Sequence, residues 1–116
     1  MESNNNIKHL QNMLLAIERL EEFSQEHTID EAMDDYRISD VILLEFENLA
    51  NAASRLDTQF KIEHSDIPFS QMIAIRNRIA HDYLSVSLET LYQTIEDNFG
   101  EFKKLLLSII KEEAIK

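Results

Sequence analysis

Side chains able to carry out acid–base chemistry gather in one short stretch of the chain. Arg76, Asn77, Arg78, His81 and Tyr83 lie within eight consecutive residues. A guanidinium offers a permanent, forked set of N–H donors that matches a phosphate, and an imidazole gives or takes a proton near neutral pH. These residue types predict an anion site at which a proton is transferred.

Cleavage of RNA without a metal ion is the reaction that fits this set of groups. The 2′-hydroxyl must lose a proton, the 5′-oxygen must gain one, and the phosphorane between them needs positive charge beside it. Tyr83 is suited to hydrogen-bond a phosphate or to stack on a base. A structural interpretation is also open. In it the two arginines pair with acidic helices, His81 caps a helix end, and Tyr83 packs as an aromatic lid.

The spacing of these residues does not place them on one face of a helix. At about 100° per residue, Arg76 and Tyr83 lie within about 20° of each other in projection. Asn77 and His81 form an i,i+4 pair roughly 100 to 140° away from them. Either the helix unwinds near His81, or these groups converge with those of a second copy across a two-fold axis. The second alternative predicts a composite site in a dimer.

The elements that carry these residues are predicted to be helices. The chain has 116 residues, which suits a single domain over residues 1–116. It contains one glycine, Gly100, and one proline, Pro68, too few for the tight turns of a sandwich or barrel. Apolar residues spaced three and four apart predict helices at about 4–26, 29–57, 68–82 and 87–113. We therefore expect an all-α, antiparallel four-helix bundle.

Local signals mark the ends of these helices. Ser3 and Ser87 are expected caps, and Thr28 followed by Glu31 has the spacing of a capping box. Pro68 suits the first turn of the third helix, because its missing N–H has no partner there. Residues 58–67 are polar and aperiodic, and we expect them to connect the second and third helices without a helix of their own. The third helix is apolar on most sides and is expected to be buried. The core is also expected to include three methionines: Met13, Met33 and Met72.

Net charge restricts where a nucleic acid can bind. Eleven Lys and Arg residues stand against 22 Asp and Glu, a net charge of -11. This charge opposes nonspecific attraction to phosphate backbones and anionic membranes. Residues 1–60 carry four basic and thirteen acidic side chains, whereas residues 61–83 carry three of each. Any contact with RNA is therefore expected at the middle segment.

Several other classes of site are not expected. Cysteine is absent, which excludes disulfides and thiolate ligands, and His9, His27 and His64 show no metal-ligand spacing. A single glycine leaves no glycine-rich phosphate loop, so we expect neither a metal nor a cofactor. No segment approaches the roughly 20 apolar residues of a membrane span, and the N-terminus does not resemble a signal peptide. We expect a cytoplasmic protein without a membrane partner.

The segment Arg76-Asn77-Arg78-Ile79-Ala80-His81-Asp82-Tyr83 resembles the Arg-x-x-x-x-His-x-Tyr signature of the HEPN superfamily, specifically HepT-like toxins of MNT/HEPN toxin–antitoxin modules. The flanking segments 52–56, 67–69 and 86–89 are also similar to that family. The resemblance covers roughly residues 30–110.

This resemblance implies an all-α bundle, a homodimer that brings two motifs together, and metal-independent endoribonuclease activity on an RNA substrate. Arg76 and His81 would be catalytic, with Asn77 and Arg78 as supporting or RNA contacts. Tyr83 would contact RNA and accept AMP from a partner, the MNT-type nucleotidyltransferase antitoxin. A bulky anion on Tyr83 would then occupy the place of the RNA phosphate.

The chain departs from the family pattern at three places. Many relatives carry a glycine–acid pair where this chain has Ala50-Asn51, and an arginine where it has Leu44. A glycine common after the motif is replaced by Ser85. A second hypothesis therefore stays open, in which the chain is a non-catalytic module that binds a nucleotide or presents Tyr83 to a nucleotidyltransferase.

Overall fold

Four long helices form the body of the molecule. The computed structural model describes the backbone of residues 2–81 and 87–115, and the side chains of residues 5–79 and 87–115. The long helices are α1 (Glu2–Glu26), α3 (Tyr36–Ser54), α5 (Phe69–His81) and α6 (Leu88–Ile115). Two short helices join them, α2 (Ile29–Asp34) and α4 (Thr58–Glu63). The predicted all-α class is confirmed.

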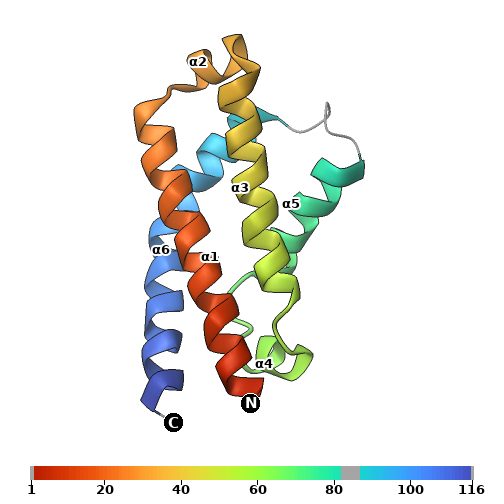
Figure 1. Ribbon diagram of the computed structural model, residues 1–116, viewed down its shortest axis with the longest axis vertical. Coiled ribbons are helices and arrows are strands. Elements are labelled where there is room, and N and C mark those ends of the chain that lie inside the picture. The colour runs from red at the N-terminus through yellow and green to blue at the C-terminus, as the bar shows by residue number, and fades with distance from the viewer. Residues whose placement is uncertain (1, 82–86, 116) are drawn as a thin grey trace.

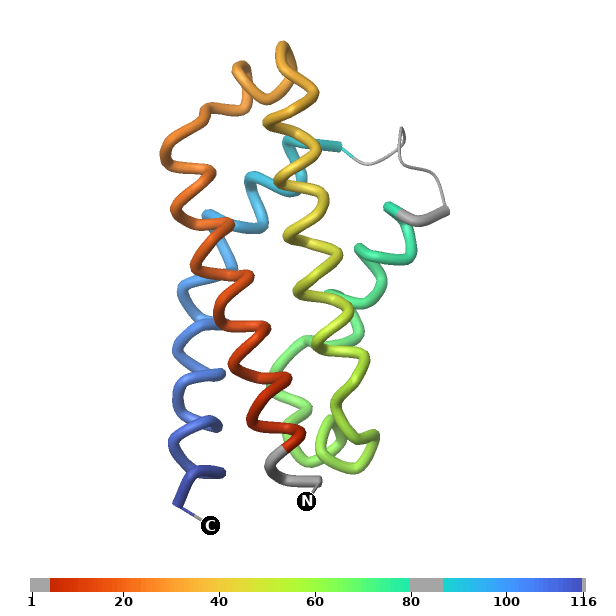
Figure 2. The backbone as a smooth tube through the Cα atoms, viewed as in Figure 1, coloured from red at the N-terminus to blue at the C-terminus, as the bar shows by residue number. Residues whose placement is uncertain are grey.

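The long helices run alternately up and down (Figure 1). Helix α1 packs against both α3 and α6, and α3 packs against α5 on its other side (Figure 2). The N-terminal end of α1 and the C-terminal end of α6 lie at the same end of the molecule. Within the described residues, none of the helices combines the length and apolar character that a bilayer span requires.

Buried side chains recur at helical spacing on each long helix and meet in one core. Phe46 of α3 and Phe99 of α6 lie at its centre, with ring centroids 5.8 Å apart and a tilted geometry that aromatic pairs favour. The buried core residues of α1 include Leu10, Met13, Ile17 and Leu20. This apolar burial is the main stabilising term of the bundle.

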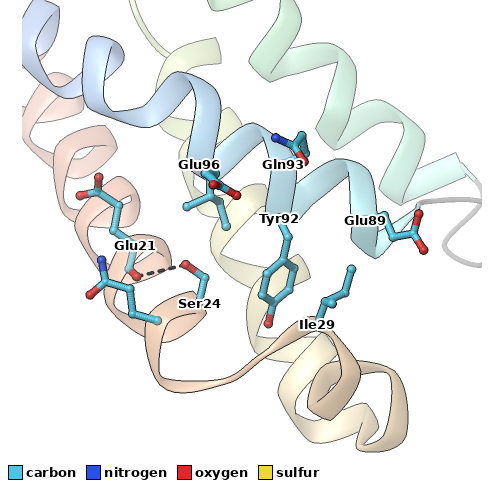
Figure 3. Close-up of a pocket in the computed structure, with 9 residues that line it drawn as sticks. Glu21, Ser24, Ile29, Glu89, Tyr92, Gln93 and Glu96 are labelled. Atoms are coloured by element: carbon cyan, nitrogen blue, oxygen red, sulfur yellow. Dashed lines mark hydrogen bonds between the residues drawn. The ribbon is translucent and has the colours of Figure 1, made fainter.

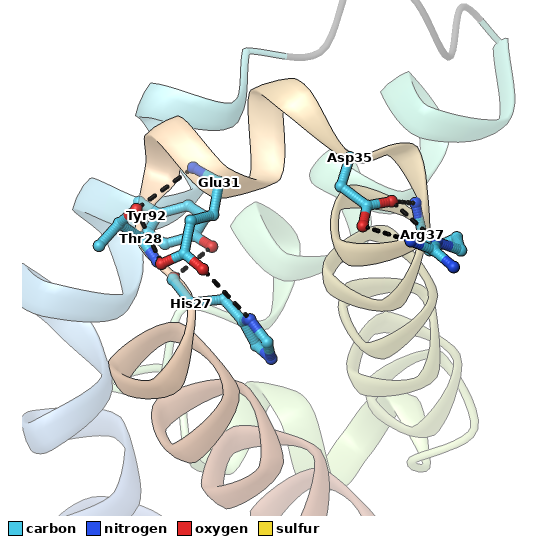
Figure 4. A network of polar contacts seen from close by, with 6 residues as sticks. All are labelled: His27, Thr28, Glu31, Asp35, Arg37 and Tyr92. Atoms are coloured by element: carbon cyan, nitrogen blue, oxygen red, sulfur yellow. Dashed lines mark hydrogen bonds and ion pairs between the residues drawn. The ribbon is translucent and has the colours of Figure 1, made fainter.

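The predicted helix over residues 29–57 is in fact two helices, α2 and α3, separated at Asp35. That residue has extended backbone angles, φ -132° and ψ 106°. Its carboxylate accepts the backbone N–H of Arg37 at 3.0 Å and also pairs with the Arg37 guanidinium (Figure 4). These hydrogen bonds hold the pKa of Asp35 below its usual range. An aspartate that caps the next helix ends the preceding one, and apolar periodicity does not reveal this.

Other boundaries confirm some expectations and correct others. Thr28 and Glu31 form the predicted capping box, and the Thr90 N–H donates to Ser87 Oγ at 3.3 Å at the start of α6. Helix α1 begins at Glu2, so Ser3 lies inside it instead of capping it. Pro68 immediately precedes α5, and its carbonyl accepts the Met72 N–H at 3.3 Å.

Three further predictions were wrong because burial depends on tertiary packing. Residues 58–67 include α4, which forms because Phe60 is buried. Met33 is 56% exposed, since the short α2 buries only Ala32. Helix α5 is not buried on most sides. It lies at the edge of the bundle, where it packs on α3, and Ser70, Ala74 and Asn77 along it are exposed.

Hydrogen bonds between distant segments fix the two ends of the bundle. The Tyr92 hydroxyl donates to the His27 carbonyl at 2.9 Å, which joins α6 to the α1–α2 corner (Figure 4). At the opposite end, the Asn6 side chain donates to the Asp57 carboxylate at 3.2 Å and accepts the Asp57 N–H at 3.3 Å. The second contact holds the residue that precedes α4.

Candidate active site

Helix α5 carries the predicted motif and packs on α3. Met72 and Ile79 are buried at 4% exposure each. Arg76 lies four residues after Met72 and three before Ile79, so it shares their side of the helix. Its side chain is accordingly half-buried, whereas Asn77 and Arg78 are exposed. Packing therefore fixes the position of Arg76 more firmly than that of Arg78.

The guanidinium of Arg76 makes one hydrogen bond within the described residues. Its Nη1 donates to Oδ1 of the neighbouring Asn77 at 3.4 Å. Neither Arg76 nor Arg78 forms an ion pair with any residue in ranges 5–79 and 87–115. Arg19 and Arg37, by contrast, pair with Glu45 and Asp35. Within those ranges, the two motif arginines do not pair with the acidic helices as the structural interpretation expected.

Helix α5 continues through His81, which is its last residue. Five residues of helix rotate the backbone by about 140° beyond one full turn, so positions 76 and 81 fall on different sides of the helix. Helical unwinding before His81 is therefore not what brings the two residues together. The imidazole of His81 and the whole of Tyr83 lie outside the described residues.

The solvent side of α3 carries an exposed apolar residue at position 44. Leu44 is 55% exposed on the solvent side of α3, and Glu47 and Asn48 flank it. A phosphate backbone lying across this surface would gain no charge-assisted hydrogen bond from Leu44. Helix α5 itself contributes two arginines in the described residues, Arg76 and Arg78.

A large hollow of about 660 Å³ lies away from α5, between α1, α2 and α6 (Figure 3). Glu21, Glu89 and Glu96 line it, together with Tyr92. Burial, followed by the charge of Glu31, raises the pKa of Tyr92, so this phenol stays neutral. Three carboxylates repel phosphate, and this hollow is therefore unsuited to RNA despite its size.

Possible metal ligands are dispersed in the described part of the chain. No three His, Asp or Glu side chains there come close enough together to hold a metal ion. Lys103 donates to Glu21 at 2.8 Å, and this hydrogen bond raises the pKa of Lys103. The Glu21 carboxylate is thus already paired with the Lys103 ammonium group.

Sequence reasoning did not single out Gln71, Thr94 and Asn98, which line a small cavity between α3, α5 and α6. Gln71 belongs to α5 and the other two to α6, so no local motif connects them. The sequence gives one indication of this arrangement. Gln71, Ile75 and Arg78 are spaced four and three residues apart, which places them on one side of α5.

The family model described as "Ribonuclease HepT-like" matches residues 13–109. The chain belongs to this family. A relative from Thermococcus cleftensis, named "Probable ribonuclease HepT", is 27% identical to this HepT-like chain over 101 residues, covering 84% of this chain and 92% of the relative. A protein of Caldanaerobacter subterraneus subsp. tengcongensis named "Putative RNase" is 22% identical over 105 residues, covering 90% and 94%.

These matches confirm the resemblance inferred from the motif and indicate a ribonuclease-type enzyme at the level of the family. The match extends from the middle of α1 into the last part of α6, so it includes every helix that surrounds the HepT-like motif. No solved structure matches this chain with statistical significance.

Proposed function

We propose that this HepT-like chain is a metal-independent endoribonuclease, the toxin of a HEPN/MNT toxin–antitoxin module. Arg76 stabilises the charge that develops on the phosphate, and His81 transfers the proton between the 2′-hydroxyl and the 5′-oxygen. The observation that carries the proposal is the burial and the missing ion pair of Arg76. It is half-buried against α3 and makes no ion pair among the described residues, at the arginine position of the motif.

The first experiment measures cleavage of total RNA in the presence of EDTA. We expect cleavage by the wild type and its loss in Arg76→Ala and His81→Ala. Arg55→Ala is the matched control, since Arg55 is an exposed arginine at the end of α3 that also lacks an ion pair among the described residues. Cleavage that persists in both motif variants, or that stops in the Arg55 variant as well, contradicts the assignment.

The active unit in this proposal is a homodimer whose two α5 helices contribute to shared sites. Positions 76 and 81 fall on different sides of one helix, which is the reason for placing the two residues in different subunits. A mixture of Arg76→Ala and His81→Ala subunits then regains about a quarter of the wild-type activity, because half the dimers are mixed and each has one intact site. Absence of any recovery, with subunit exchange verified, argues for a site within one chain.

Regulation follows from the same proposal. The partner is an MNT-type nucleotidyltransferase antitoxin that transfers AMP to the hydroxyl of Tyr83, placing an anion where the RNA phosphate would bind. We expect labelled AMP to enter the wild type and Tyr36→Phe but not Tyr83→Phe. Tyr36 is a suitable control because it is 73% exposed on α3. Labelling of Tyr83→Phe at the wild-type level contradicts this part.

The net charge of -11 and the exposed Leu44 favour one alternative, a non-catalytic module that binds a nucleotide or presents Tyr83 to its partner. The same experiments separate it from the nuclease. Incorporation of AMP at Tyr83, without RNA cleavage by the wild type under any protein concentration tested, supports the module.

A further inference from the structure

A groove with a volume of about 250 Å³ lies between α1 and α3, which run side by side in opposite directions (Figure 1). Ala16 of α1 and Ala52 of α3 line its buried part, at 2% and 3% exposure, and their small side chains leave room between the two helices. Asn12 and Asn48 line its exposed part. The groove is therefore open to solvent along the α1–α3 contact.

The residues along this groove have the spacing of a coiled-coil seam. Three residues on each side are three and four positions apart: Asn12, Leu15 and Arg19 on α1, and Asn48, Asn51 and Arg55 at the end of α3. Two adjacent seams of this kind accept a further helix, whose side chains pack between them. The spacing therefore favours a helix as the occupant of the groove.

Large apolar side chains are exposed along this surface. Leu15 lines the groove and is 44% exposed. Leu44 is 55% exposed and lies one turn before Asn48 on the same side of α3. The side-chain amides of Asn12 and Asn51 have no hydrogen-bond partner among the described residues. An occupant with apolar side chains and a polar margin would remove these leucines from water and engage the amides.

An arginine stands at each end of the groove. Arg19 contacts Glu45 at 3.8 Å, and its side chain is 59% exposed, so most of its N–H donors face solvent. Arg55 is exposed and forms no ion pair with the described residues. Positions 45 and 55 are ten residues apart on α3, which separates the two ends of the groove by about 15 Å. A helical occupant would meet both arginines with carboxylates about ten residues apart.

Two other occupants fit this surface less well. A second copy related by a two-fold axis would bring the same arginines together from both subunits, and like charges repel. An RNA strand needs a continuous row of cations, whereas this groove has one at each end and a leucine and asparagines between them. The arrangement therefore favours a protein segment with a few well-spaced carboxylates.

We propose that the groove between α1 and α3 binds an amphipathic helix of a partner protein, one that carries carboxylates at both ends of an apolar stripe. Leu15 and Leu44 contact the apolar stripe, and Arg19 and Arg55 bind the carboxylates. None of the residues that line the groove belongs to the motif helix α5. The inference therefore goes beyond the proposed ribonuclease function and does not depend on it.

A stapled helical peptide of about sixteen residues, with two glutamates ten residues apart and two leucines between them on the same side, is the probe. We expect saturable binding in amide NMR titrations, with shifts confined to α1 and α3. Arg19→Ala and Arg55→Ala should each weaken binding about threefold, as expected for one exposed ion pair. Leu15→Asp should weaken it about tenfold. Lys104→Ala and Leu107→Asp, matched changes at exposed positions of α6, should leave the affinity unchanged.

Charge reversal tests the role of the two arginines. A peptide with lysines in place of the glutamates should bind the wild type about tenfold more weakly than the first peptide. It should prefer the double variant Arg19→Glu/Arg55→Glu, which circular dichroism shows to be folded. Equal affinity of the wild type for the two peptides, or no binding of the first peptide at millimolar concentration, overturns the proposal.

The remaining outcomes identify a different occupant and also overturn the proposal. An RNA dodecamer that binds the wild type but loses affinity in Arg19→Ala and Arg55→Ala would make the groove an RNA surface. An oligomer that dissociates in Leu15→Asp but not in Leu107→Asp, as measured by sedimentation, would make it a contact between copies. Because peptide binding requires no catalysis, failure of this proposal leaves the ribonuclease function in place, and loss of the ribonuclease function leaves the groove in place.

Discussion

Replacing Gly100 by alanine should stabilise the protein. Gly100 lies in the interior of α6, is exposed, and has an ordinary helical backbone with no positive φ. A Cβ added there meets no atom within 4 Å. Glycine in a helix interior is about 1 kcal/mol less favourable than alanine, because its backbone loses more freedom on folding. Since no contact offsets this gain, we expect the full effect.

The magnitude can be checked by urea unfolding followed by circular dichroism at 222 nm. An increase of about 1 kcal/mol in the free energy of unfolding corresponds to a rise of about 4 °C in Tm for a domain of this size. The reverse type of substitution, Ala74→Gly, serves as the control. Ala74 is exposed within α5, so this change should lower the free energy of unfolding by about 1 kcal/mol. Both proteins should be measured at two concentrations, since self-association makes stability concentration-dependent.

A loss of stability in Gly100→Ala would refute this reasoning. It would mean that the added methyl group meets something that the single chain does not contain, such as a second copy packed on this side of α6. RNA cleavage should be unchanged in Gly100→Ala, because Gly100 does not belong to the motif helix.

Two further predictions concern the corner where α1, α2 and α6 meet. Tyr92→Phe removes the hydrogen bond to the His27 carbonyl and should cost about 1 kcal/mol in thermal unfolding, whereas Tyr36→Phe, at an exposed tyrosine, should cost nothing measurable. Because the pKa of Tyr92 is raised above 10.0, its stabilising contribution is complete below pH 10 and falls as the pH rises through the folded-state pKa. Tyr92→Phe should therefore lose less stability than the wild type in that alkaline range. Hydrogen bonds from Thr28 lower the pKa of Glu31 below 4.5, so its contribution is complete above pH 4.5 and disappears as the pH falls through the folded-state pKa. The difference in stability between wild type and Glu31→Gln should accordingly shrink in acid, and a difference that stays constant from pH 6 to pH 3 would disprove this assignment.

Local sequence signals predicted the bounds of the motif helix closely. The motif helix was expected at about 68–82 and lies at Phe69–His81. Residue spacing alone puts positions 76 and 81 of this helix on different sides, because rotation around a helix depends only on spacing. The amides of Gln71 and Asn98 were not predicted to share a cavity, because 27 residues separate them and only packing of α5 and α6 onto α3 brings them together.

The sequence by itself determined that this chain is helical, where two of its helices are capped, and which octet carries the family motif. These properties depend on spacing and on hydrogen bonds within a few residues, as between Thr28 and Glu31. Tertiary structure alone decided that a short helix forms around the buried Phe60 and that α5 lies at the edge of the bundle. The physical reason is that apolar periodicity shows which side of a helix avoids water but not which neighbour covers it.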